Sequence, residues 1–308
     1  MKIFKPKFWD KNYHTFLSVI LFPVSLVYQL IVFLKKKISA KKNFPIPIIC
    51  IGNIYIGGTG KTPLAIKTFE ILKELNKNPV IIKKDYANHK DEILLLKNYS
   101  NILVSKNRVD AINEAIKKAF DCVILDDGYQ DFQIKKNLNI VCFHKNQKIG
   151  NGQTLPSGPL RESLRSLRDS QIVLLNGIKD MEFENKLKKY NPGLKFFYYS
   201  YLTKNIENFK NKKLIAFAGI GNPNNFFDFL KINHLNLIKE VSYPDHYEYS
   251  EKELDSLSEM EKQHKAKLIT TEKDYFRINP LFRKRVSYIP IKVKLEDKDF
   301  KDTIKKFI

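Results

Sequence analysis

The chain has 308 residues, of which 43% are hydrophobic, and its 54 Lys and Arg against 33 Asp and Glu give a formal net charge of +21. This length and composition can fill one large hydrophobic core or two smaller ones, which argues against a largely disordered chain. The three cysteines, Cys50, Cys122 and Cys142, lack metal-ligand spacing and lie in apolar runs. We therefore expect reduced, buried thiols and a cytoplasmic compartment rather than a disulfide framework.

The positive charge has two interpretations. A surplus of this size favours anionic partners, such as nucleic acid, acidic lipid headgroups or phosphorylated substrates. Alternatively it reflects composition alone, because the lysines are scattered along a chain rich in Lys, Asn and Ile. No recognisable nucleic-acid motif is present and the aromatic residues do not interleave with a basic stripe, so no nucleic-acid partner is expected.

The first distinctive element is an apolar run over residues 16–34, FLSVILFPVSLVYQLIVFL. Such a run is just long enough to cross a bilayer core of about 30 Å. Trp9 and Tyr13 precede it and Lys35–Lys37 follow it, as is typical of residues at a membrane interface. A cleaved signal peptide is disfavoured because no small-residue cleavage site follows, and basic flanks argue against a buried core helix. We expect residues 1–43 to form a membrane anchor, kinked at Pro23, with spanning and monotopic insertion both open.

After residue 44, short β-rich runs alternate with helical runs. Alternation of this kind predicts an α/β fold with a mostly parallel sheet and flanking helices. A polar, turn-rich stretch over 176–212 suggests a boundary, so we expect a nucleotide-binding core over 44–190 and a smaller C-terminal α/β part over 191–308. The expected strands are 47–52, 79–83, 121–125, 139–143, 171–175, 195–201, 213–218, 267–270 and 287–293.

Residues 56–63 read IGGTGKTP and lie between an expected strand and a helical run. A strand, a glycine-rich turn and a helix together predict a phosphate loop of the P-loop NTPase type. The glycines let backbone N–H groups turn inward, and the helix N-terminus adds partial positive charge. Lys61 is suited to the terminal phosphates and the Thr62 hydroxyl to Mg²⁺. The expected nucleotide-binding set is Gly57, Gly58, Thr59, Gly60, Lys61 and Thr62.

This loop matches neither common variant. The standard motif requires glycine where this chain has Tyr55, and the variant of partitioning-type ATPases requires lysine where this chain has Ile56. A glycine-rich turn without a ligand is the alternative, which the flanking strand and helix disfavour.

The stretch DCVILDDGYQDFQI places Asp126 and Asp127 directly after four apolar residues. A strand that presents carboxylates at its carboxyl end is how nucleotide enzymes hold Mg²⁺, directly or through water. Alone, this pattern is equally typical of an ordinary strand followed by a turn. Together with the upstream phosphate loop it predicts a metal site.

Three further polar segments are ambiguous on residue pattern alone. In GPLRESLRSLRDS, Arg161, Arg165 and Arg168 recur at i, i+4 and i+7, which predicts one basic helix face for phosphate or simply for solvent. Glu162 near that helix start is a candidate metal ligand. His246 follows Asp245 in a turn, where it is either structural or active in proton transfer.

Taken together, these segments resemble the tetraacyldisaccharide 4′-kinase family of lipid A biosynthesis. The stretches that carry the resemblance are GNIYIGGTGKTP, DEILLL, LVSKNRVDA, ILDDGYQDFQI, GNGQTLPSGPLRE, FAGIGNPNNFF, YPDHYEYS and TTEKD, together with the apolar N-terminus. The resemblance implies transfer of the γ-phosphate of ATP, with Mg²⁺, to the 4′-hydroxyl of a tetraacylated glucosamine disaccharide 1-phosphate, giving lipid IVA. It implies a site on the cytoplasmic face of a Gram-negative inner membrane, and no obligate protein partner is inferred.

Residue roles follow where the motifs match. The resemblance implies that Asp91, which spacing alone would assign to an ordinary helix start, activates the sugar hydroxyl with support from His246. Lys61 joins them as the third catalytic residue. It further implies a phosphate contact at Arg161 and metal ligands at Thr62, Asp126, Asp127 and Glu162.

The chain departs from the family pattern in three places. KKDYAN replaces an SRGYG-like stretch, Ile93 replaces the proline of a DEP motif, and Asp131 replaces a histidine after DDGYQ. Two other functions are weighed against the kinase: a membrane-associated partitioning-type ATPase, and a basic membrane or nucleic-acid adaptor without catalysis. Ile56 counts against the first, and the intact Lys61 motif against the second.

Overall fold

The computed structural model describes residues 6–11, 13–86, 90–203, 206–295 and 298–308. Its contacts divide the chain into two units. The large unit comprises Lys5–Asp85, Ser100–Ser200 and Val293–Ile308, and the small unit consists mainly of Tyr86–Tyr99 and Tyr201–Lys292. The chain thus leaves the large unit after Asp85 and re-enters it at Ser100. The expected functional segments, 1–43, 44–190 and 191–308, remain a prediction.

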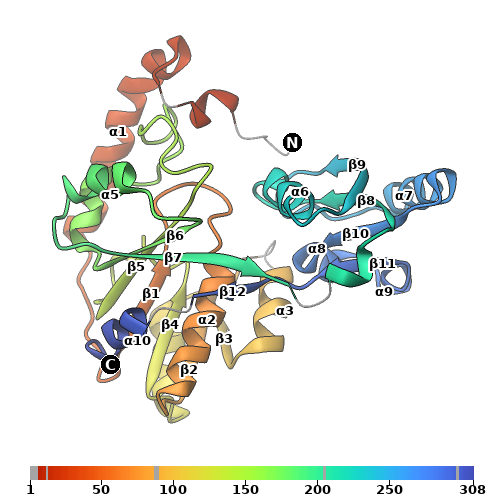
Figure 1. The fold of residues 1–308 in the computed structure, drawn as a ribbon. Helices are drawn as coiled ribbons and strands as arrows, with labels where there is room; N and C mark the ends of the chain where they lie inside the picture. The colour runs from red at the N-terminus through yellow and green to blue at the C-terminus, as the bar shows by residue number, and fades with distance from the viewer. Residues whose placement is uncertain (1–5, 12, 87–89, 204–205, 296–297) are drawn as a thin grey trace. The chain divides into compact units, whose positions relative to one another are not determined.

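The large unit is built on an eight-stranded sheet in the order β12-β7-β6-β5-β1-β4-β2-β3 (Figure 1). The pairs from β7 through to β3 are parallel. The strands are β1 (Ile48–Gly52), β2 (Pro79–Lys84), β3 (Ile102–Ser105), β4 (Cys122–Asp126), β5 (Leu138–His144), β6 (Ile172–Asn176), β7 (Lys195–Leu202) and β12 (Lys292–Lys294).

Helices cover this sheet, so its central strands are apolar throughout, as parallel strands buried on both faces must be. Helix α2 contacts β1, β2 and β4, and α4 contacts β2 and β3. Val109 and Ile112 of α4 and Phe183 of α5 enter one core cluster with alternate strand residues such as Cys50. The helical elements of this unit are η1 (Lys7–Asp10), α1 (Phe16–Ile38), α2 (Lys61–Glu74), α4 (Arg108–Lys117), η2 (Leu164–Asp169), α5 (Met181–Lys188) and α10 (Lys298–Lys305).

Strand β1 lies between β4 and β5. The chain places β2, β3 and β4 on one side of β1 and then crosses to place β5, β6 and β7 on the other, so the strand order reverses at β1. The carboxyl ends of adjacent strands at such a switch point form the usual crevice for a ligand in an open α/β sheet. The phosphate loop follows β1 and the two aspartates end β4. The register pairs Ile51 with Asp126 and Asp126 with Lys83, which brings three strand ends together.

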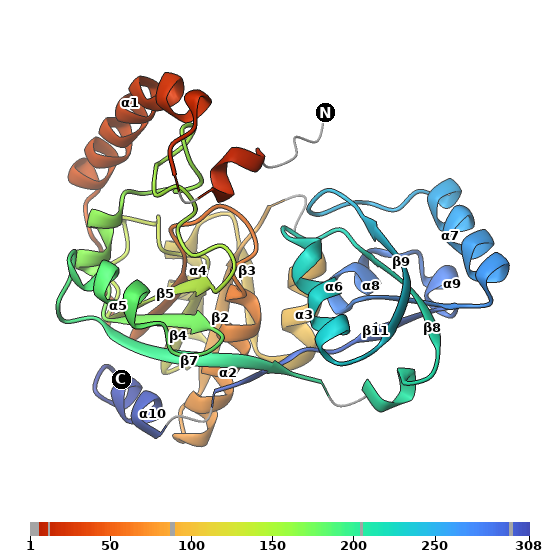
Figure 2. The same ribbon diagram turned by 45° about the horizontal axis from the view of Figure 1, so that its top comes forward.

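Helix α1 is a single 23-residue helix in which an 18-residue stretch has mean hydropathy 2.4, so it is long and apolar enough to cross a membrane by length and composition. It continues through Pro23. Its Ser18 and Ser25 are buried while most of its large apolar side chains are exposed. Figure 2 shows it beside the loop that links β5 to η2.

The small unit contains a parallel four-stranded sheet in the order β11-β10-β8-β9 (Figure 2). Strand β8 is its switch point, because the chain passes first to β9 and then back across to β10. Aromatic side chains of α6 pack on one cluster and leucines of α7 on another. The elements are α3 (Lys90–Tyr99), η3 (Ile206–Phe209), β8 (Lys213–Ala218), α6 (Pro223–Ile232), β9 (Asn236–Ser242), α7 (Glu251–His264), β10 (Lys267–Thr271), α8 (Glu272–Arg277), α9 (Pro280–Arg283) and β11 (Val286–Ile289).

The predicted α/β class and parallel sheet are confirmed, and eight expected strands occur with ends shifted by at most one residue. The expected strand 287–293 is instead two strands, β11 and β12, because Pro290 interrupts the run. Strands β3 and β9 were not expected. Both are edge strands: β3 is only four residues long, and β9 carries polar residues along most of its length, so neither shows the longer apolar run that marks a buried strand.

Replacement of Gly52 by alanine should destabilise the large unit. A Cβ at this position would lie 2.5 Å from Cβ of Tyr129, a buried residue that cannot move away easily. Overpacking of this kind costs about 1–3 kcal/mol, to be measured by urea unfolding. Gly193→Ala in an exposed turn is the control, expected to change stability by less than about 0.5 kcal/mol. Equal effects of the two substitutions would contradict the packing argument.

Candidate functional site

The phosphate loop runs from the end of β1 to the first turn of α2. Gly57 and Gly60 have φ of 102° and 81°, a region that residues with a Cβ rarely adopt. Asn53 ties the loop together, because its buried side-chain N–H₂ donates to the carbonyl of Tyr55 at 2.6 Å and to Oγ1 of Thr59 at 2.8 Å. The sequence analysis missed this residue, since an Asn after a strand is also a common turn residue.

Thr62, in the first turn of α2, faces the end of β4. Its hydroxyl donates to Oδ2 of the fully buried Asp126 at 3.2 Å. The same carboxylate oxygen accepts from Nζ of Lys83, which lies 2.7 Å away and is also buried. Lys83 belongs to the unusual KKDYAN segment, and it compensates a carboxylate charge that water does not reach.

The other oxygen of Asp126 is suited to a metal ion. Oδ1 is buried and has no hydrogen-bond partner within the described part of the chain. An unsatisfied buried carboxylate oxygen beside a threonine hydroxyl fits Mg²⁺, which takes oxygen ligands and keeps several waters or phosphate oxygens. No cluster of three or more His, Cys, Asp or Glu suited to a metal occurs among the described residues. Such a site would therefore depend on the nucleotide for part of its ligand set.

Asp127 is held differently. Arg161 binds it through both terminal nitrogens, at 2.8 and 3.4 Å, and Nζ of Lys61 lies 3.9 Å from its Oδ1. Burial alone would raise the pKa of Asp127, but the charges of Lys61 and Arg161 outweigh it and hold the pKa well below its usual range. Its backbone has φ of 57°, stabilised by Arg108, which donates to the carbonyls of Asp126 and Asp127.

The expected basic helix face is wrong. Arg161 precedes the helical segment, which is the 3₁₀ helix η2, and only Arg161 turns toward the phosphate loop while Arg165 and Arg168 are exposed. This 3₁₀ helix is wound more tightly than an α-helix, and within it the hydroxyl of Ser166 donates to the carbonyl of Ser163 at 2.9 Å. Arg161 also donates to the carbonyl of Asn53 at 2.9 Å.

In the part of the chain that the structure describes, Glu162 does not bond to the phosphate loop directly but is linked to it through Gln130. It is buried, accepts from Nε2 of Gln130 at 2.8 Å, and burial raises its pKa. Gln130 in turn donates to the carbonyl of Asn53 at 3.1 Å. Glu162 is thus connected to the phosphate loop through two residues, and no contact joins it directly to Asp126.

A second polar cluster lies in the small unit, where the carboxyl ends of β8 and β10 meet. Asp91, at the start of α3, is buried, with its Oδ1 3.3 Å from Nδ1 of His246. Arg277 of α8 donates to the Oδ2 of Asp91 at 2.5 Å. Through its other terminal nitrogen Arg277 binds Oδ1 of Asp274 at 3.0 Å and the carbonyl of Gly219.

The environment of Asp91 favours its ionised form. Burial alone would raise the pKa of Asp91, but the hydrogen bond with His246 and the charges of Arg277 and Lys273 outweigh it, so that the pKa lies well below its usual range. His246 has φ of 54°, and its backbone N–H donates to Gly219 at 3.0 Å. A left-handed histidine beside a buried carboxylate is the kind of local strain that accompanies functional sites.

The structure thus joins Lys61, Thr62, Asp126, Asp127 and Arg161 in the large unit, and Asp91 with His246 in the small unit. Sequence analysis missed Asn53, Lys83 and Arg277. The TTEKD segment was noted, but the arginine three residues beyond it gave no signal, because a basic residue near a helix end usually serves only the helix dipole.

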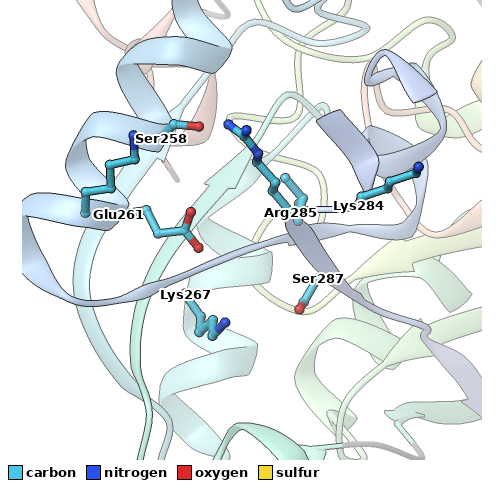
Figure 3. A pocket seen from close by; sticks show the side chains of 8 residues that line it. Ser258, Glu261, Lys267, Lys284, Arg285 and Ser287 are labelled. Carbon is cyan, nitrogen blue, oxygen red and sulfur yellow. The ribbon is translucent and has the colours of Figure 1, made fainter. Parts of the chain in front are cut away.

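A separate hollow of about 440 Å³ lies elsewhere in the small unit, between α7 and the amino ends of β10 and β11 (Figure 3). Its lining includes Glu261, Lys267 and Arg285. Asp274 follows the carboxyl end of β10, so this hollow lies at the opposite end of that strand from the Asp91 cluster.

The doubly wound parallel sheet and the glycine-rich loop before α2 define a P-loop nucleotide-binding protein of the α/β class. The family model "Tetraacyldisaccharide-1-P 4'-kinase" (LpxK) matches residues 17–308. The chain belongs to this family.

Named relatives and one solved structure agree with this assignment. The chain is 42% identical to the tetraacyldisaccharide 4'-kinase of Pelagibacter ubique, over 96% of this chain and 95% of the relative. It is 34% identical to that of Rickettsia canadensis, over 91% and 90%. A crystal structure of LpxK from Aquifex aeolicus in complex with ATP has the same fold, with a TM-score of 0.72 and 24% identity, covering 95% of this chain and all of that one.

The Lys83–Asp126 pair should contribute to the free energy of unfolding. Lys83→Met leaves a buried carboxylate without its cation, and removing one partner of a buried pair typically costs about 3–5 kcal/mol. The double variant Lys83→Met with Asp126→Asn removes both charges and should regain much of that loss. Urea unfolding of the two single variants and the double variant forms a double-mutant cycle. Additive losses would show that the two side chains do not interact.

Proposed function

We propose that this protein transfers the γ-phosphate of ATP to the 4′-hydroxyl of a tetraacylated glucosamine disaccharide 1-phosphate, the step of lipid A biosynthesis that forms lipid IVA. The observation that carries this proposal is family membership over residues 17–308 combined with the Asp91–His246 pair. A partitioning-type ATPase or an adaptor has no use for a buried carboxylate and histidine of this kind.

In the large unit, backbone N–H groups of the phosphate loop and the N-terminus of α2 bind the nucleotide phosphates. Lys61 and Arg161 supply positive charge for the γ-phosphate. Both now contact Asp127, so that aspartate keeps the two cations close to the phosphate loop. Phosphoryl transfer depends mainly on such positioning and charge neutralisation.

Thr62 and Asp126 are the residues that would hold Mg²⁺. The support is the unpartnered Oδ1 of Asp126 beside the Thr62 hydroxyl. When bound, the ion neutralises charge on the transferring phosphate. Asp127 is occupied by two cations and Glu162 by Gln130, so we assign Asp126 rather than these two as the acidic ligand.

In the small unit, Asp91 is the group that accepts the proton of the sugar hydroxyl. The proton leaves late in a loose transition state, so an ionised, well-placed carboxylate matters more than a strong base. His246 contacts one oxygen of Asp91 and so helps to orient that carboxylate toward the sugar hydroxyl.

Substitutions in the two units should affect different steps. Asp91→Asn should lower transfer to the lipid by about 10²–10⁴-fold, because it removes a general base, while leaving nucleotide affinity unchanged. Lys61→Ala should lower both transfer and nucleotide affinity. Transfer is measured with γ-labelled ATP and tetraacyldisaccharide 1-phosphate in detergent, and affinity by calorimetry with a non-hydrolysable ATP analogue.

The same assay separates the other functions. Lipid-independent ATP hydrolysis that rises with dimer formation and survives Asp91→Asn would favour a partitioning-type ATPase. Full biological activity of Lys61→Ala would favour an adaptor. Label in a bisphosphorylated lipid, lost in both variants, supports the kinase.

We also propose that the protein sits on the cytoplasmic face of the inner membrane, with α1 inserted in one leaflet rather than spanning it. Ser25 donates to the carbonyl of Thr154 at 3.0 Å, Gln29 binds the hydroxyl of Thr154, and Ser157 binds the carbonyl of Ser18. The polar side of the helix is thus bound along its length to a polar loop. A spanning position would carry this loop into hydrocarbon, whereas monotopic insertion needs only the opposite, apolar side.

Charges on the exposed side of α1 should therefore abolish membrane binding. Ile20 and Ile31 are 54% and 60% exposed, and replacing both with aspartate should release the protein from anionic lipid vesicles in a flotation assay. ATP-analogue affinity should not change. The control, Gln29→Leu, removes a docking contact but no apolar surface and should still bind vesicles. Vesicle binding by the aspartate variant would refute insertion through this face.

The positive charge of the chain can be tested in the same flotation assay. If this charge contributes to membrane binding, binding of the wild type should weaken as the salt concentration rises.

A further inference from the structure

The small unit contains a charged group that the proposed mechanism does not yet use, the guanidinium of Arg277. Its side chain is 7% exposed, so it lies too deep to reach a lipid substrate directly. Its position between two buried carboxylates, Asp91 on one side and Asp274 on the other, indicates an action on those groups instead.

Asp274 is the fixed end of this arrangement. Its Oδ1 accepts from the N–H of Gly219 at 3.0 Å, from the hydroxyl of Tyr249 at 2.9 Å and from Arg277. Its Oδ2 accepts from Thr271 at 2.6 Å. Besides Arg277, three donors, from Gly219, Tyr249 and Thr271, hold this carboxylate to the carboxyl ends of β8 and β10, so a guanidinium bound to it has a defined place.

Asp91 is the end that remains adjustable. Its two oxygens meet Arg277 and His246, and Arg277 also approaches Nδ1 of His246 at 3.4 Å. Two carboxylates and one guanidinium carry one net negative charge. The oxygens of Asp274 also accept from neutral donors of Gly219, Tyr249 and Thr271, whereas those of Asp91 are contacted by Arg277 and His246, so Asp91 is the carboxylate on which Arg277 and His246 both act directly.

We infer that Arg277 is a positioning residue that keeps Asp91 ionised and oriented for proton acceptance. The inference rests on the proposed function only for the identity of the proton donor, the sugar hydroxyl. The other charged groups near Asp91 are already engaged: Lys273 pairs with Glu92 on α3, and His246 is adjacent to Asp245. Arg277 is the cation that bonds Asp91 directly and is also tied to the sheet.

The sign of the expected pH effect follows from this geometry. Asp91 acts when ionised, so activity falls as pH drops through its pKa. Arg277 contributes to holding that pKa below its usual range, whereas burial acts in the opposite direction. Removal of the guanidinium therefore raises the pKa of Asp91 and moves the acidic limb of the rate profile to higher pH.

The experiment compares Arg277→Met, Arg277→Lys and the control Arg283→Met in the full-length protein. Arg283 is a nearby arginine that bonds the backbone carbonyls of Ile278 and Phe276 and stacks on aromatic rings. Two readouts are taken: the pH profile of kcat for lipid phosphorylation, and the carboxyl ¹³C shift of Asp91 against pH, assigned with Asp91→Asn.

Arg277→Met should lose more activity at acidic than at alkaline pH, because the acidic limb moves to higher pH and each pH unit below the pKa of a required carboxylate costs about tenfold. Arg277→Lys keeps the charge but loses the two-armed contact, so it should retain the wild-type acidic limb with a lower kcat. Arg283→Met should show the wild-type profile. If Arg277→Met is too unstable to assay, Arg277→Gln, which also removes the charge, replaces it in the same two readouts.

An unchanged Asp91 titration in Arg277→Met would overturn the inference and leave Arg277 a structural residue. Loss of activity equal at every pH would do the same. If the wild type phosphorylates no lipid, the proposed function fails, but the carboxyl titration still decides whether Arg277 controls Asp91.

Discussion

The carboxylate of Asp126 is wholly buried, and the central part of the site is arranged around it. Lys83 from β2 and Thr62 from α2 both bind one of its oxygens, so three elements are fixed relative to one another at a single atom. The parallel register makes this possible, because it places Lys83 directly beside Asp126 on the neighbouring strand. The same interaction fixes the carboxylate while its second oxygen, Oδ1, has no hydrogen-bond partner in the described part of the chain. That oxygen is therefore available as a ligand for a metal ion.

The pairing of buried acids with cations recurs throughout the site. Asp127 is bound by Arg161, and Asp91 by Arg277. Each cation comes from a segment distant in sequence from its acid. Burial without a cation would push each acid toward its neutral form, so these pairs allow carboxylates to remain charged where water is scarce.

The sequence was sufficient for the class of fold and for residues that belong to local motifs. Lys61 and Thr62 lie in a short pattern whose chemistry is set by the loop itself, and Asp126 ends an apolar run. Lys83 and Arg277 could not be predicted, because each acts on a partner that only the sheet register or a crossover brings near. The helix expected to align three arginines failed because it begins only at Leu164, beyond Arg161, and is a 3₁₀ helix, whose three-residue turn does not align residues at i, i+4 and i+7.

Pairing of opposite charges also explains two departures from the family pattern. Lys83, in the altered KKDYAN segment, is compensated by Asp126, and Asp131, in the altered DDGYQD segment, lies 3.5 Å from Arg108. Arg108 is buried and holds the carbonyls of both site aspartates. A carboxylate at position 131 balances that buried charge. Each of these two unusual residues is therefore paired with an opposite charge beside the aspartates.

Helix α1, the proposed anchor, and the phosphate loop are both hydrogen-bonded to one loop, residues 151–161. Its Thr154 and Ser157 bind the polar side of α1, and Tyr28 of α1 donates to the carbonyl of Arg161 at 2.9 Å. The same loop bonds the other side to the phosphate loop, with the N–H of Ile56 donating to Pro159 and that of Arg161 to Ile54. If α1 inserts in one leaflet as proposed, the hydrogen bonds that run from it through this loop to the phosphate loop would hold a bound nucleotide at a fixed height above the lipid surface, where an amphiphilic acceptor stays.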